Sequence, residues 1–188
     1  VMEEFTSLVV EKTKALKIGP GSDPDSIVVP VIDQASKDNI KAMVERGVKD
    51  GGNVLTGGGV PTGSPFDNGT FVEPTVMTKV AADSFIACEE IFGPVLSIIP
   101  SSNAEDALEI ANSVEYGLSA GIFTRNLNSV LDFADRIEAG IVKINGETAF
   151  DTAKDCAFNT GIISICFLKA IPCFFTARHL TRDNRFAA

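Results

Sequence analysis

The residues of this chain most suited to chemistry lie in one short segment, from Cys88 to Val95. The ionised carboxylate of Glu90 has two acceptor oxygens and could accept hydrogen bonds from both hydroxyls of a ribose. Gly93 and the proline after it favour a turn that would present this carboxylate and the ring of Phe92 at the start of an apolar strand. Spacing alone is also compatible with a solvated Glu90 and a core Phe92.

Other candidate residues have simpler explanations. The triplet Gly57-Gly58-Gly59 could cradle a phosphate, but it lacks the glycine spacing between strand and helix of a phosphate loop, so we expect a flexible turn. Cys88 has no histidine nearby in sequence, and we expect a buried or idle thiol. His179 has no paired motif. Asn145 and Glu147 could approach a substrate, but we favour strand and turn roles for them.

The remainder of the chain alternates helical and extended patterns. Helices are predicted over 3–17, over 36–50, after an N-cap at Asn103, and over 127–137. Strands are predicted over 54–55, 95–99, 120–123 and 141–144, whereas Pro74 makes 71–76 an edge strand or no strand. Strand, helix, strand, helix and strand between 95 and 144 imply two right-handed crossovers and a parallel sheet. The fold class is therefore α/β.

Apolar spacing also predicts which helical faces lie in the core. On the second helix the inward residues are Ile40, Met43 and Val44. On the last helix we expect an inward stripe made of Leu127, Val130, Leu131, Ala134 and Ile137.

Composition excludes several classes of protein. The 188 residues carry a formal net charge of -9, which argues against nucleic-acid partners. No apolar run reaches the roughly 18 residues of a membrane span. Four dispersed cysteines and the absence of a secretory signal suggest reduced thiols and a cytoplasmic location. Because Val1 leads directly into a helical pattern, we expect the chain to begin inside a longer protein.

The end of the chain differs from the rest. Residues 1–150 hold 22 acidic and 11 basic side chains, whereas residues 151–188 hold three acidic and five basic ones. The tail also has three of the four cysteines and an apolar run without regular spacing. We interpret 150–188 as an atypical tail, foreign to the preceding fold through a shifted frame or misjoined exon. A packed C-terminal element and a membrane- or partner-binding segment remain alternatives.

The segment Glu89-Glu90-Ile91-Phe92-Gly93-Pro94-Val95 resembles the E-x-F-G-P motif of the NAD(P)-dependent aldehyde dehydrogenase superfamily. Further blocks match in the family's order, so that the resemblance covers about residues 1–149. They are Phe71 to Val76, Ala111-Asn112, Tyr116 to Thr124 and Gly140 to Gly146. The sequence from Lys143 to Thr148 is most similar to that of semialdehyde-oxidising enzymes, including the ketoglutarate-semialdehyde type.

The resemblance implies an incomplete three-layer, parallel-sheet catalytic domain. It implies that Glu90 holds the nicotinamide ribose of NAD or NADP and that Phe92 packs beside the nicotinamide. In the family a cysteine thiolate attacks the aldehyde, hydride passes to the cofactor from the resulting thiohemiacetal, and a carboxylate base activates the water that releases the carboxylate product. The resemblance places that nucleophile and base upstream of Val1, so no catalytic residue is expected in this chain.

Partners follow from the same resemblance: a small aldehyde substrate, and a parent enzyme that is a homo-oligomer, dimer or tetramer. The family's P-F-G-G block, expected after Thr148, is replaced by an unrelated sequence from Ala149 on. We therefore expect the isolated chain to lack dehydrogenase turnover. Alternatives are a non-catalytic truncated subunit that pairs with full-length copies, a nucleotide-binding module without chemistry, and a defective gene product. No metal site is expected.

Overall fold

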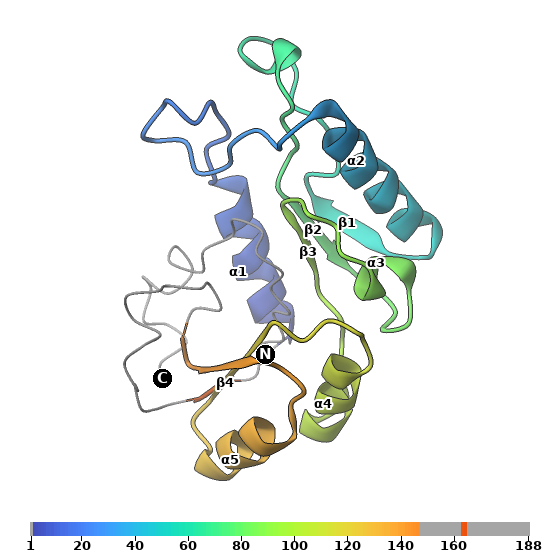
Figure 1. The fold of residues 1–188 in the computed structure, drawn as a ribbon, viewed down its shortest axis with the longest axis vertical. Helices are drawn as coiled ribbons and strands as arrows, with labels where there is room; N and C mark the ends of the chain where they lie inside the picture. Colours follow the sequence, from blue (N-terminus) through green and yellow to red (C-terminus); the bar gives the residue numbers. More distant parts are fainter. Residues whose placement is uncertain (1, 147–162, 165–188) are drawn as a thin grey trace. The chain divides into compact units, whose positions relative to one another are not determined.

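The computed structural model describes residues 2–146 and 163–164. The chain divides into two compact units, Val1–Pro100 and Ser101–Ala188, and each is described by itself (Figure 1). The tail boundary expected between residues 149 and 150 lies outside the described residues, and it stays a prediction.

The first unit carries the candidate motif and contains a mixed, three-stranded sheet. Its strand order is β1-β2-β3, with β1 antiparallel and β3 parallel to β2. The helices α1 and α2 were predicted, whereas the short helix α3 between β2 and β3 was not. In chain order the elements are α1 (Met2–Lys14), α2 (Gln34–Lys49), β1 (Asn53–Thr56), the 3-10 turn η1 (Phe66–Asn68), β2 (Thr75–Thr78), α3 (Phe85–Cys88) and β3 (Val95–Ser97).

Strand β2 separates two apolar layers, because successive side chains of a strand point to opposite faces. Val76 packs in a cluster with Val9 of α1, and Met77 packs in another cluster with Val44 of α2 and Ile86 of α3. Helix α1 therefore covers one face of the sheet, while α2 and α3 cover the other (Figure 1). The first unit thus has the predicted three layers.

Two predictions for this sheet need correction. Pro74 led us to expect an edge strand or no strand over 71–76. Residues 71–74 are not strand, but β2 begins at Thr75 and is the central strand, so no ladder bond is lost to the proline. Strand β3 was expected to be covered on both faces, but its side chains are half-buried because it forms one end of this three-stranded sheet.

In the second unit, the order of strand, helix and strand gives one parallel pair. Strands β4 (Ser119–Thr124) and β5 (Ile141–Ile144) are parallel and joined by α5 (Leu127–Arg136). Helix α4 (Ala104–Asn112) precedes them, and β6 (Ile163–Ser164) lies antiparallel to β4. In the described part, β3 pairs with β2 and not with β4, so the single sheet predicted for 95–144 is divided between the units.

The predicted inward stripe of α5 is wrong in part. Phe133 is buried with Ile137, and Val130 packs against the same core, whereas Leu127, Leu131 and Ala134 are exposed. The helix carries two apolar stripes with helical spacing, one with Leu127 and Leu131 and the other with Phe133 and Ile137. The sequence period alone does not distinguish between them. Packing of the large Phe133 ring against β4 selects the stripe that contains it. Among the described residues, none of the helices is long and apolar enough to cross a membrane.

Candidate functional site

Helix α2 is the helix against which the loop of the candidate site packs. Its N-terminus is capped by Asp33, whose carboxylate accepts a hydrogen bond from the Ser36 N–H at 2.7 Å. That hydrogen bond favours the ionised form and holds the pKa of Asp33 below its usual value. The helix buries Ile40, Met43 and Val44, the three residues predicted to face inward. A capped helix with a buried face is a firm support for the loop that packs on it.

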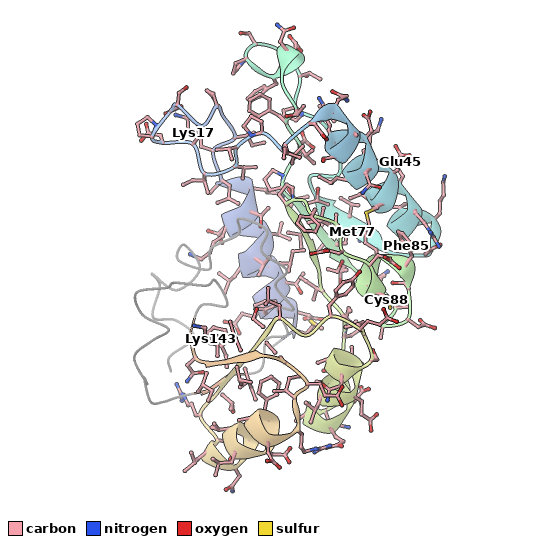
Figure 2. All side chains as sticks on the ribbon, viewed as in Figure 1. Lys17, Glu45, Met77, Phe85, Cys88 and Lys143 are labelled. Carbon is pink, nitrogen blue, oxygen red and sulfur yellow. The ribbon has the colours of Figure 1, made fainter. Side chains whose placement is uncertain are left out.

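The motif begins with α3, a helix of four residues that packs against α2 (Figure 2). The helix ends where the Glu89 N–H donates to the Phe85 carbonyl at 2.9 Å. The chain then becomes extended, and Ile91 packs against the core cluster that contains Val44 and Met77. The residue between two predicted site residues is therefore anchored in the core.

Phe92 is held outside the core. The residue is 59% exposed, and its φ is +51°, in the left-handed region that bulky residues rarely adopt. Such a conformation costs on the order of 1–3 kcal/mol and persists only where the surroundings impose it. Here Gly93 is buried beneath it, and the Pro94 carbonyl accepts a hydrogen bond from the Thr75 N–H at 2.8 Å. The alternative of a core Phe92 is therefore excluded.

Glu90 is half-buried, two positions before that ring. In the part of the chain that the structure describes, no hydrogen bond or ion pair occupies its carboxylate. Glu73, by contrast, uses its carboxylate within the fold, since its Oε2 accepts from the Gly59 N–H at 3.1 Å. The acceptor oxygens of Glu90 are thus available, and a diol such as a ribose is a chemically suitable donor for them.

The structure shows what the glycine turn and Cys88 contact, while the flexibility of the turn and the reactivity of the thiol stay predictions. Gly58 and Gly59 donate their N–H groups to the Thr75 hydroxyl at 2.9 Å and to Glu73, so this turn does not offer those groups to a phosphate. Cys88 is a half-buried free thiol whose Sγ donates to the Ala82 carbonyl at 3.5 Å.

Asn145 has a structural role. Its φ is +47°, and its side-chain amide bonds both the N–H and the carbonyl of Thr124, at 3.1 and 3.4 Å. These bonds join the ends of β4 and β5, as expected for a strand or turn residue. Glu147 and His179 lie outside the described residues. Among residues 2–146 and 163–164, no group of three potential ligands could hold a metal ion.

Sequence reasoning missed the residues that support the motif. The guanidinium carbon of Arg46 lies 3.6 Å from the centre of the Phe85 ring. A Cβ atom placed on Gly93 would lie 2.6 Å from Cδ1 of Ile40, so the backbone there rests directly on α2. The patterns around these residues gave no signal of these contacts, because each joins α2 to a distant part of the chain.

Comparison with known proteins places this arrangement in a family. Residues 1–160 match the profile described as "Aldehyde dehydrogenase family". The chain belongs to the aldehyde dehydrogenase family. The resemblance inferred from the E-x-F-G-P segment and its neighbouring blocks is confirmed.

Curated relatives within the aldehyde dehydrogenase family include the semialdehyde enzymes that the sequence resembles. The chain is 38% identical over 149 residues to the alpha-ketoglutaric semialdehyde dehydrogenase of Bacillus subtilis (strain 168), covering 79% of this chain and 30% of that protein. It is also 38% identical over 143 residues to the betaine aldehyde dehydrogenase of Brucella anthropi, covering 76% and 29%. The chain thus spans about 30% of the length of these relatives.

Solved aldehyde dehydrogenase structures share the fold. The Mycobacterium tuberculosis aldehyde dehydrogenase complexed with NAD+ superimposes with a TM-score of 0.75 and 37% identity, covering 80% of this chain and 30% of that one. The Staphylococcus aureus betaine aldehyde dehydrogenase P449M mutant in complex with NAD+ gives a TM-score of 0.73 and 28% identity, covering 77% and 29%. The predicted α/β class, as a partial catalytic domain with parallel strands, is confirmed.

Proposed function

We propose that this chain provides the nicotinamide-facing part of an NAD(P)-dependent aldehyde dehydrogenase that oxidises a small aldehyde to a carboxylate. The observation that carries the proposal is the arrangement of residues 90–93. Ile91 and Gly93 are anchored to the core, whereas Glu90 offers an unoccupied carboxylate and Phe92 an exposed ring. The NAD+ named with two of the solved relatives supports the identity of the ligand.

Each of the two residues has a distinct task in this proposal. The carboxylate of Glu90 accepts hydrogen bonds from both hydroxyls of the nicotinamide ribose, and each charge-assisted bond contributes about 1.5–3 kcal/mol. The ring of Phe92 packs beside the nicotinamide and restricts where its reactive carbon lies. When bound, NAD(P) accepts the hydride from the substrate. The residues described here bind and orient, and they do not exchange protons or electrons.

We propose that the 188-residue chain does not turn over an aldehyde by itself. Within residues 2–146 the one cysteine is Cys88, and its thiol donates to the Ala82 carbonyl from the end of α3. We therefore do not assign Cys88 as the nucleophile, and, as the family resemblance implies, the proposal places the covalent step in a part of the catalytic domain other than residues 2–146. The relatives, more than three times as long as their matched region, support that view. The homo-oligomeric state, a cytoplasmic location and the individual aldehyde stay predictions.

Two small ligands can separate the contributions of ribose and ring. Nicotinamide riboside carries both, and N1-methylnicotinamide keeps the cationic ring without the ribose. Both lack a phosphate, which avoids repulsion by a chain with a net charge of -9. Their dissociation constants can be measured by following the amide signals of Glu90 and Phe92 in a two-dimensional NMR titration.

The matched variants are Glu90→Gln and Glu89→Gln, because the neighbouring Glu89 is an exposed carboxylate with the same charge. Loss of one charge-assisted bond corresponds to a roughly tenfold or greater loss of affinity. We expect Glu90→Gln to weaken the binding of nicotinamide riboside by that factor and to have a much smaller effect on the binding of N1-methylnicotinamide. Glu89→Gln should leave both dissociation constants within about twofold of those of the unaltered chain. Equal effects of the two variants on the riboside would refute the assignment of Glu90.

A further inference from the structure

Helix α2 contacts the segment 86–93 at three points. Three α2 residues spaced at i, i+4 and i+7 lie on one face of the helix. The further along α2 such a residue lies, the earlier in the chain is its partner in the segment 86–93. Counted along α2, the contacts are Ile40 with Gly93, Val44 with the cluster against which Ile91 packs, and Gly47 with Ile86. The segment 86–93 therefore runs antiparallel to α2, and its position depends on that helix.

The end of this contact near α3 is held by a cation in addition to the core packing of Ile86. Arg46 is next to Gly47 on α2, and its guanidinium carbon lies 3.6 Å from the centre of the Phe85 ring. Its Nε lies 3.9 Å from the Asp50 carboxylate, one turn further along the helix. A guanidinium over an aromatic face contributes about 0.5–1 kcal/mol at an exposed site. The pair therefore ties the first residue of α3 to α2 from the solvent side.

We propose that Arg46 is a positioning residue for the pair Glu90 and Phe92. It acts through Phe85, whose carbonyl accepts the hydrogen bond from the Glu89 N–H that ends α3. A tilt of α3 would move Glu90, the second residue after the helix, while Gly93 stays fixed on Ile40. The inference rests on the proposed function in one respect, namely that Glu90 and Phe92 hold the nicotinamide riboside.

The test uses the 188-residue chain, the variants Arg46→Met and Arg46→Lys, and the control Lys41→Met. Lys41 is also an exposed cation of α2 with an i,i+4 carboxylate partner, Glu45, but it lies over no aromatic ring of the described residues. Two measurements are made on each variant. One is the hydrogen-exchange rate of the Glu89 amide relative to the amides of β2. The other is the dissociation constant of nicotinamide riboside.

In Arg46→Met we expect the Glu89 amide to exchange about two- to fivefold faster, because this factor corresponds to the free energy of an exposed cation–π contact. The exchange rates of the β2 amides should not change. The dissociation constant should rise by a similar factor, and Arg46→Lys should recover part of both effects. A merely structural role would accelerate all amides of the first unit together and leave the dissociation constant unchanged. That result, or identical behaviour of Arg46→Met and Lys41→Met, would overturn the inference.

Failure of the proposed function would be distinguishable. If the unaltered chain shows no saturable binding of nicotinamide riboside, the proposed function fails, and the exchange rate of the Glu89 amide then decides alone whether Arg46 positions this segment. Faster exchange confined to 85–93 would support that role, and unchanged exchange would overturn it.

Discussion

Substitution of Gly93 by alanine tests directly whether the motif rests on α2. A Cβ atom at this position would lie 2.6, 2.7 and 3.0 Å from three side-chain carbons of Ile40, and contacts this short require something to move. Ile40 is 1% exposed and is enclosed by the core, so its side chain has little room to rotate away. The clash must therefore be relieved by displacement of the motif or of α2.

The expected magnitude follows from two opposing effects. Overpacking a core position costs about 1–3 kcal/mol. Replacing a glycine that is not in the left-handed region by alanine stabilises by about 0.4–1 kcal/mol, because the unfolded chain loses freedom. We therefore expect Gly93→Ala to lower the free energy of unfolding by about 1–2 kcal/mol. The variant should also weaken the binding of nicotinamide riboside, since Phe92 immediately precedes the displaced residue.

Urea unfolding followed by circular dichroism gives the free energy, and Gly21→Ala is the matched control. A Cβ atom on Gly21 would meet one carbon at 3.9 Å, which is an ordinary contact, so we expect no loss of stability there. In a double-mutant cycle, Ile40→Val removes the nearest carbon, and the penalty of Gly93→Ala should shrink. If Gly93→Ala and Gly21→Ala have the same free energy of unfolding, the close packing of the motif on α2 is wrong.

Three further predictions concern local interactions. Phe92→Gly should leave the free energy of unfolding unchanged or raise it, because relief of the left-handed strain offsets the loss of an exposed ring, yet it should abolish binding of both nicotinamide ligands in the NMR titration. Asn126→Ala should lower the free energy of unfolding by about 1 kcal/mol, because its side chain accepts from two N–H groups in the first turn of α5. The hydrogen bond from Arg136 holds the pKa of Glu105 below its ordinary 4.5, so this pair stabilises the fold above that pH and ceases to do so as the pH falls through the lowered pKa. A carbon-detected NMR titration should show the pKa of Glu105 returning toward 4.5 in Arg136→Gln, and an unchanged pKa would contradict the pairing.

Local sequence signals predicted the elements that local interactions determine. Asn103 was expected to cap α4, and its side chain does accept the Asp106 N–H, because a cap depends only on residues within one turn. Ile40 and its neighbours on α2 faced inward as expected, because that helix has a single apolar stripe. On α5, two overlapping stripes made the period ambiguous, and only the packing of Phe133 distinguished them.

The sequence nominates the candidate residues of the site, but it does not predict how the fold holds them. The residues Glu90 and Phe92 were selected by chemistry and by resemblance, and the structure leaves both available for a ligand. The left-handed backbone at Phe92 could not be predicted, because an aromatic residue has no propensity for it. The supporting contacts, Arg46 with Phe85 and Ile40 with Gly93, join segments far apart in the chain, and no single-sequence pattern encodes such pairs.

The central claim, that Glu90 and Phe92 hold the nicotinamide end of the cofactor, is tested most directly by proximity. Intermolecular nuclear Overhauser effects can be measured between the chain, labelled at its phenylalanine rings, and saturating nicotinamide riboside. We predict cross-peaks from the Phe92 ring to the nicotinamide ring protons. Their loss in Glu90→Gln at the same ligand concentration would show that the carboxylate holds the ribose. Saturable binding without any contact to Phe92, or with contacts to other phenylalanines alone, would contradict the account.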